Sequence, residues 1–176
     1  MQEICNEAGM SPGNVYRYFP SKEAIIAGIA ENDRADVMEK FAAMAQAPDF
    51  FTGLESLARY HLVERPDEEF ALCAEIMAES RRNPEVARIY QQVEDAVRER
   101  LIAALQRAAE TGEIAAPANG FDEVVTIMTA LADGLCWRRA VDPGFDPQTV
   151  LGTVLATVRC LLRVQGAART AGGELQ

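Results

Sequence analysis

The sequence predicts an all-α protein, and three observations lead to that class. Apolar residues recur at three- and four-residue steps through most of the 176 residues, the spacing that places them along one side of a helix. Helix-start signals such as Ser11-Pro12 and Asn83-Pro84 precede several of these runs. Stop signals such as Thr111-Gly112 follow them. Together they predict a chain of helices joined by short turns.

An early segment predicts two helices that meet across a tight turn. Gly9 suits the left-handed backbone that ends a short helix, and Ser11 can cap the next helix with Pro12 in its first turn. Val15 and Phe19, four residues apart, share the packing face of this second helix. Its other face then presents Gly13, Asn14, Tyr16 and Arg17. The arrangement is a helix-turn-helix with one face free to touch a partner.

The free face carries the side chains that DNA contacts require. Asn14 can pair with an adenine edge, and Ser11 with the exposed helix start can meet a phosphate. Tyr16, Tyr18 and Lys22 can donate hydrogen bonds to the flanking phosphates. Double-stranded DNA therefore fits this set best. The alternative is that the aromatic residues here form the core of a small helical corner.

Six further helices are expected along the rest of the chain. They cover about residues 21–45, 50–64, 68–82, 84–110, 121–141 and 147–164. The first links the helix-turn-helix to the body, with Ser21 as its cap. We expect three parts: residues 1–33 as an incomplete DNA-binding domain with the start of the linking helix, 34–166 as a regulatory and dimerisation domain, and 167–176 as a disordered tail.

The last two of these helices are apolar around most of their circumference, so both sides need a cover. One side can face the body, and the other is most simply covered by the same helices of a second subunit, as a four-helix interface about a two-fold axis. The residues expected in this interface are Val124, Met128, Leu131, Leu135, Leu151, Val154, Leu155, Val158 and Leu162. The alternative is a pair of fully buried helices in a monomer.

Large, adaptable side chains occur along the helices of the body, where they suit either a cavity or a packed core. The candidates for a ligand pocket are Phe41, Tyr60, His61, Phe70, Met77, Tyr90, Met128 and Trp137. Such walls suit a small apolar ligand of moderate size, oriented by a few polar groups such as His61 and Tyr90.

Residues 8–25 read Ala-Gly-Met-Ser-Pro-Gly-Asn-Val-Tyr-Arg-Tyr-Phe-Pro-Ser-Lys-Glu-Ala-Ile. This segment resembles the DNA-binding signature of the tetracycline-repressor (TetR) family. The resemblance implies a dimeric, all-helical transcriptional regulator whose larger domain binds a small molecule. By position, it implies base contacts at Pro12, Gly13 and Asn14 and phosphate contacts at Tyr16, Tyr18 and Lys22, with Arg17 at a more variable position that can face DNA.

The sequence departs from this pattern at its start. A unit of this kind needs a first helix of about four turns to cover the other two, whereas Met1 falls inside the second helix. We therefore expect a preceding, basic helix in the complete regulator, with the chain as given being a fragment or starting too late.

Composition narrows the functions further. The formal net charge of −10 argues against a protein that coats nucleic acid generally. Residues 1–22 are neutral, because Arg17 and Lys22 balance Glu3 and Glu7, so the end expected to face DNA is the least acidic part. No apolar run approaches the roughly 18 residues of a membrane span, and no signal segment is visible.

Catalytic and metal sites are not indicated either. The four cysteines are scattered and there is a single histidine, which gives no metal-ligand spacing and suggests reduced thiols in a cytoplasm. No glycine-rich phosphate loop or nucleophile elbow occurs, so we expect no enzyme, cofactor or metal. The hypothesis is a homodimeric repressor released from a pseudo-palindromic DNA operator by a small apolar effector. The alternative is a helical dimeric ligand-binding or adaptor protein without DNA binding.

Overall fold

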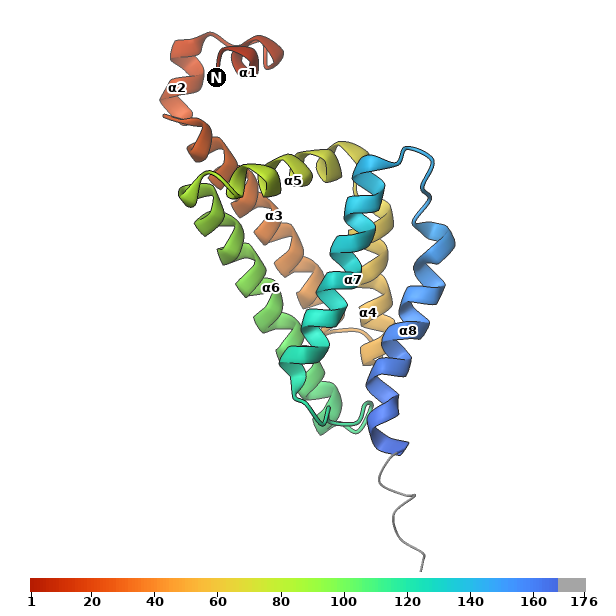
Figure 1. The fold of residues 1–176 in the computed structure, drawn as a ribbon. Coiled ribbons are helices and arrows are strands. Elements are labelled where there is room, and N and C mark those ends of the chain that lie inside the picture. The colour runs from red at the N-terminus through yellow and green to blue at the C-terminus, as the bar shows by residue number, and fades with distance from the viewer. Residues whose placement is uncertain (168–176) are drawn as a thin grey trace, which may run out of the picture.

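The computed structural model describes residues 1–167, with side chains through Leu162, and every regular element in that part is a helix (Figure 1). The elements are α1 (Gln2–Glu7), α2 (Pro12–Tyr18), α3 (Lys22–Met44), α4 (Phe50–Arg59), the π-helix η1 (Tyr60–Glu64), α5 (Asp67–Ser80), α6 (Pro84–Glu110), α7 (Phe121–Val141) and α8 (Gln148–Ala167). The all-α class is confirmed. The tail predicted for 167–176 lies outside the described residues, apart from Ala167, which ends α8.

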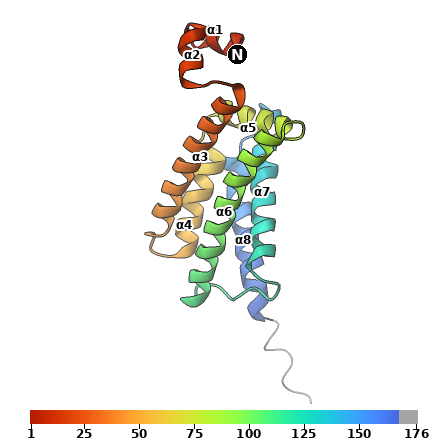
Figure 2. The ribbon, with the colours of Figure 1, turned by 90° about the vertical axis from the view of Figure 1, so that its left-hand side faces the viewer.

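The helices form a bundle with a small unit at one end. Figures 1 and 2 show α1 and α2 beyond the body, connected to it by α3, while α5 crosses the same end of the bundle. Helix α3 packs against α4 and α6, α5 packs against α6 and α7, and α8 packs against α4, η1 and α7. Among the described residues, no helix has both the length and the apolar composition needed to cross a bilayer.

The local signals read from the sequence act as predicted. Gly9 adopts a left-handed φ of 62° at the end of α1, which a side chain would disfavour. Ser11 caps α2, with its Oγ accepting from the Asn14 backbone N–H at 3.3 Å. Ser21 caps α3 in the same way, with its Oγ 3.1 Å from the Ala24 nitrogen. These caps fix where α2, called the recognition segment from here on, and the linking helix α3 begin.

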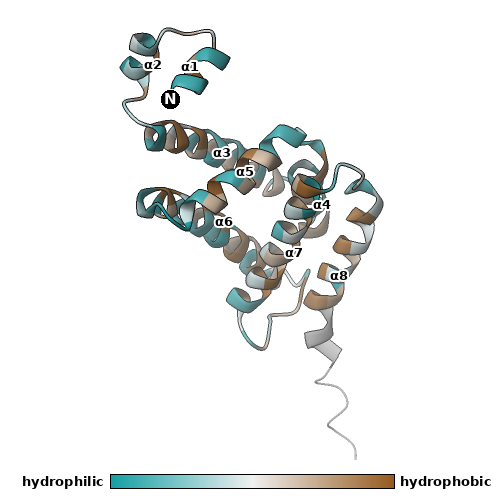
Figure 3. Ribbon diagram, turned by 45° about the horizontal axis from the view of Figure 1, so that its top comes forward, coloured by the Kyte–Doolittle hydropathy of each residue, from teal (hydrophilic) through white to brown (hydrophobic). Residues whose placement is uncertain are grey.

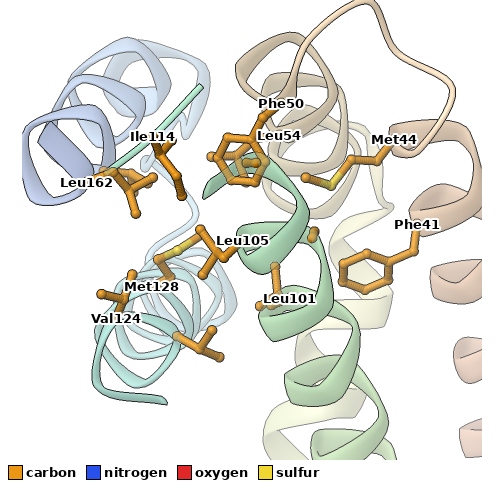
Figure 4. Close-up of a cluster of buried hydrophobic side chains, with 14 residues drawn as sticks. Phe41, Met44, Phe50, Leu54, Leu101, Leu105, Ile114, Val124, Met128 and Leu162 are labelled. Carbon is orange, nitrogen blue, oxygen red and sulfur yellow. The ribbon is translucent and has the colours of Figure 1, made fainter. Parts of the chain in front are cut away.

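The core lies in the part of the bundle away from α1 and α2, between α3, α4, α6, α7 and α8 (Figure 4). Leu105 and Val125 are completely buried there. Gly53 allows α4 to approach the end of α3, because a Cβ at this position would lie only 2.8 Å from the Met44 carbonyl oxygen. The cavity described below borders this core, because Phe41, Leu54, Leu101, Met128 and Val158 of the cluster also line it.

The residues expected in a dimer interface divide into two groups. Val124, Met128, Leu151, Val158 and Leu162 are buried within the single chain, so they pack in its own core. Leu131, Leu135, Val154 and Leu155 are only half-buried and retain accessible surface. In Figure 3, hydrophobic residues occur along α7 and α8, whereas α1 is largely hydrophilic. The interface itself stays a prediction.

Candidate functional site

The residues predicted to contact DNA lie together on and beside α2. Tyr16 and Tyr18 are 49% and 62% exposed, and Ser11, Pro12, Gly13, Arg17 and Lys22 are exposed as well. Asn14 is half-buried, while Val15 is buried on the opposite face of the helix. One side of α2 therefore anchors the helix and the other presents polar groups to solvent.

Three of these side chains form a local network. The Arg17 Nη2 donates to Asn14 Oδ1 at 2.9 Å, and the guanidinium carbon lies 5.1 Å from the centre of the Tyr18 ring. The contacts hold Arg17 along the exposed face and orient the Asn14 amide. An oriented amide beside a guanidinium is able to donate and accept hydrogen bonds at base edges.

Two contacts hold the start of α3, one with the body and one with the segment that precedes it. Asn83, the cap of α6, donates its side-chain N–H to Glu23 Oε1 at 3.0 Å. Phe19 packs over Gly28, where a Cβ would lie 3.2 Å from the ring. The first contact ties the beginnings of α3 and α6, and the second lays the end of the recognition segment on α3.

A cavity of about 630 Å³ occupies the body between α3, α4, η1, α5, α6, α7 and α8. The eight residues predicted to line a pocket all face it: Phe41, Tyr60, His61, Phe70, Met77, Tyr90, Met128 and Trp137. Met77 and Trp137 are also exposed, so they mark where the cavity opens to solvent. A mostly apolar space of this volume is in the range of small-molecule sites.

The π-helix η1 places His61 in the wall of this cavity. The sequence predicts one continuous helix over residues 50–64, whereas the turn widens at Tyr60. Arg139 of α7 accounts for the difference, because its guanidinium donates to the carbonyl oxygens of Leu62, Val63 and Arg65 at 2.9, 3.1 and 2.9 Å. A widened turn supported by another helix is typical of functional sites.

His61 is enclosed by protein atoms, and the surface it keeps faces the cavity. Burial, with a smaller contribution from the charge of Arg65, lowers the pKa of His61 to about 4, so the imidazole is neutral at physiological pH. Its Nε2 lies 3.5 Å from the Cys136 Sγ. Burial and the charge of Asp133 raise the pKa of Cys136 to about 12, so this group is a thiol.

An acidic pair, which sequence reasoning missed, also faces the cavity. Glu94 on α6 and Asp133 on α7 both line it. Burial raises the pKa of both carboxyl groups, and the charge of Asp133 adds to the effect on Glu94. Tyr90 lies one turn before Glu94, and burial together with the charge of Glu94 raises the pKa of Tyr90. The only signal in the sequence was spacing: Tyr90 lies four residues before Glu94, and Trp137 lies four residues after Asp133.

Arg65 joins three elements at the edge of the cavity. Its guanidinium is 7% exposed and lies 2.8 Å from Asp33 Oδ1 on α3 and 2.7 Å from Glu69 Oε2 on α5. Burial alone would lower the pKa of Arg65, but the hydrogen bond to Glu69 and the charge of Asp33 raise it, so the group stays charged. The linking helix is thus bonded directly to the wall of the cavity. Within the described residues, no cluster of His, Cys, Asp or Glu is arranged to hold a metal ion.

Comparison with known proteins agrees with this geometry. Residues 56–163 match the family described as "BetI-type transcriptional repressor, C-terminal", and residues 1–29 match "Bacterial regulatory proteins, tetR family". The chain belongs to the TetR family. The TetR resemblance of the α2 segment thus extends through the body, and the matched descriptions denote regulators rather than enzymes.

Individual relatives of this TetR-family chain include the HTH-type transcriptional regulator UidR of Escherichia coli K12 and of Shigella flexneri, each 32% identical over 120 residues. The match covers 68% of this chain and 60% of the relative, so it spans about three fifths of the length of UidR. Among solved structures, Salmonella enterica GusR superposes with a TM-score of 0.76 at 27% identity, covering 92% of this chain and 83% of GusR.

Proposed function

We propose that this TetR-family protein is a ligand-responsive, DNA-binding transcriptional regulator. The observation that carries the proposal is the pairing of an exposed polar face on α2 with a cavity in the body, joined by one helix, α3. The likeness to UidR, a transcriptional regulator by name, supports it, as does the match of residues 1–29. That match speaks against the alternative of a ligand-binding protein or adaptor without DNA binding.

In this proposal α2 enters the major groove of an operator. Asn14 and Arg17 reach base edges together with the backbone at Pro12 and Gly13, and the remaining exposed donors bind phosphates. These phosphate contacts come from Ser11, Tyr16, Tyr18 and Lys22. Their exposure supports these roles, because none has to leave a buried site to reach DNA.

The proposed regulator is a homodimer in the cytoplasm that binds a pseudo-palindromic site, because two recognition helices read two half-sites about one DNA turn apart or a multiple of it. The half-buried residues of α7 and α8 and the exposed Ile127 would form the contact. Ile127→Glu with Leu131→Glu is expected to halve the mass in sedimentation, whereas Leu72→Glu on α5 is expected to leave it unchanged. A dimer that survives the first pair would move the interface elsewhere.

The proposed effector binds in the cavity and releases the protein from DNA. Arg65 supplies a physical connection, because it bonds the cavity wall to Asp33 on α3. A ligand that favours one arrangement of α3 and α5 must change DNA affinity by linkage if that arrangement spaces the two α2 helices differently. Phe19, which lines the cavity and packs over Gly28, lies at the junction of α3 with the recognition segment.

The test is binding to DNA fragments from either side of the gene, using protein made from its own gene with its natural start. We expect specific binding that Asn14→Ala weakens by about 1 to 3 kcal/mol, with relaxed preference at one base pair. Asn119→Ala, the same change in an exposed loop before α7, is the control and should bind like the wild type. Absence of specific binding to any flanking DNA at low salt would overturn the proposal.

A further inference from the structure

We propose that the cavity accepts a ligand with a protonated amine on an apolar body, and that Glu94 and Asp133 bind the amine. The inference rests on the proposed function, since it names the class of effector for the same cavity. The proposed ligand is therefore not purely apolar. Its charge lies between α6 and α7, at the side of the cavity where Trp137 is exposed to solvent.

The first argument is a missing counter-charge. The other carboxylates that line the cavity have a basic partner: Asp33 and Glu69 both pair with Arg65, at 2.8 and 2.7 Å. Among the described residues, neither Glu94 nor Asp133 has an ion pair. Glu94 is partly buried in a largely apolar space and is repelled by the charge of Asp133, so its ionised form is costly there without a cation.

The second argument is independent of the acidic pair and concerns His61. Its ring is enclosed, and the Cys136 thiol at 3.5 Å is a partner for Nε2 only. Nδ1 has no protein partner within the described residues, and it is not occluded, so it faces the cavity. A buried imidazole with a free nitrogen aimed into a cavity marks the space as a binding site. Because this imidazole is neutral, it does not repel a cation and can bond a second polar group of the ligand.

The third argument is the surroundings of the acidic pair. Tyr90 lies one helical turn before Glu94, and Trp137 lies one turn after Asp133, so an aromatic ring accompanies each carboxyl group. Aromatic faces attract cations and also pack against an apolar body. Glu94 is the more enclosed carboxylate and Asp133 the more exposed, which places the amine at Glu94 with Asp133 nearer the opening.

A matched set of probes separates charge from shape. Dibenzylamine is protonated at neutral pH, dibenzyl ether has the same shape without charge, and diphenylacetate carries a negative charge on a similar body. Binding is measured without DNA by calorimetry and by the fluorescence of Trp137, which is the only tryptophan of the chain and lines the cavity. We expect the amine to bind roughly tenfold or more tightly than the ether, and diphenylacetate to bind most weakly.

Variants locate the charge effect. Glu94→Gln and Asp133→Asn keep the shapes of the side chains, and the double variant is expected to bring the amine down to the affinity of the ether. Asp95→Asn, the neighbouring exposed carboxylate outside the cavity lining, should retain the preference. Equal binding of amine and ether by the wild type, a preference for diphenylacetate, or no binding of the amine would each overturn the inference.

The outcome is distinguishable from failure of the proposed function. Operator binding is measured in the absence of any probe, and probe binding is measured in the absence of DNA. A protein that binds DNA but shows no preference for the amine retains the regulator proposal and loses this one. A protein that prefers the amine but binds no flanking DNA retains this inference and loses the regulator proposal.

Discussion

The start and the middle of α3 lead to polar groups that are held in opposite ways. Before its first residue, the polar side chains of α2 are exposed, or half-buried for Asn14, and they bond to each other, as Arg17 does to Asn14 three residues away. In the middle of α3, Asp33 is bonded to Arg65, 32 residues distant in sequence, and faces a cavity that several helices line. Solvent sets the behaviour of the first group, and packed protein sets that of the second.

This difference teaches where substitutions should act. A group whose partners are local and exposed contributes little to folding, because water replaces whatever contact is lost. A group enclosed among several helices holds those helices together, and its removal leaves buried partners without solvent. Changes on α2 should therefore alter recognition while leaving stability intact, and changes around the cavity should do the reverse.

The largest effect is expected at Arg65. Arg65→Met removes a guanidinium that is 7% exposed and leaves Asp33 and Glu69 without their cation. We expect a loss of about 3 kcal/mol in the free energy of unfolding, at the low end for a buried pair because both carboxylates are partly exposed. Urea denaturation measures it. Arg82→Met removes an ion pair of similar length whose arginine is 74% exposed, and a comparable loss there would contradict the comparison.

One substitution made in both regions sharpens the contrast. Gly53→Ala places a Cβ 2.8 Å from the Met44 carbonyl oxygen, so the end of α3 and the start of α4 must separate, at about 2 kcal/mol. Gly13→Ala on α2 meets no atom within 4 Å and should leave the unfolding midpoint unchanged while altering DNA binding. Thermal and urea unfolding measure the change in stability of each variant relative to the wild type. Equal destabilisation would mean that the α2 unit is as tightly packed as the body.

The smallest effect, taken per unit of pH, is a pH dependence set by His61. Its pKa is about 4 in the folded protein and 6.5 is its ordinary value, so between those values the unfolded chain takes up a proton that the folded chain does not. Stability should therefore fall as pH falls through this window, by up to about 1.4 kcal/mol per unit. In His61→Asn this contribution is absent. If the wild type and His61→Asn lost the same free energy of unfolding between pH 6.5 and 4, His61 would not be enclosed as described.

The same contrast explains what the sequence could predict. The α2 segment is defined by signals three or four residues apart, such as Ser11 capping Asn14, so its start and exposed face follow from the sequence. The eight cavity residues were recognisable as large side chains on apolar helix faces, but Glu94 and Asp133 carry no such signal, because a carboxylate on a helix is ordinarily in solvent. Their proximity depends on how α6 packs against α7, which no local pattern contains.

The π-helix was out of reach for a related reason. Residues 50–64 have uninterrupted helical periodicity, and the widened turn at Tyr60 depends on Arg139, more than 70 residues later. The burial of Val124 and Leu162 within a single chain likewise follows from tertiary packing. A helix apolar on most sides is equally compatible with a core and with an interface, so its sequence alone leaves the partner open.

The contact between Asp33 and Arg65 also sets a length scale for motion. Asp33 lies 11 residues after Lys22 in α3, which at 1.5 Å per residue makes an arm of roughly 17 Å between this fixed point and the recognition segment. By simple geometry, a tilt of about 10° around Asp33 carries the far end through roughly 3 Å, close to the 3.4 Å rise of one base pair. In the proposed regulator, a tilt of this size is thus large enough to put α2 out of step with the bases of the operator.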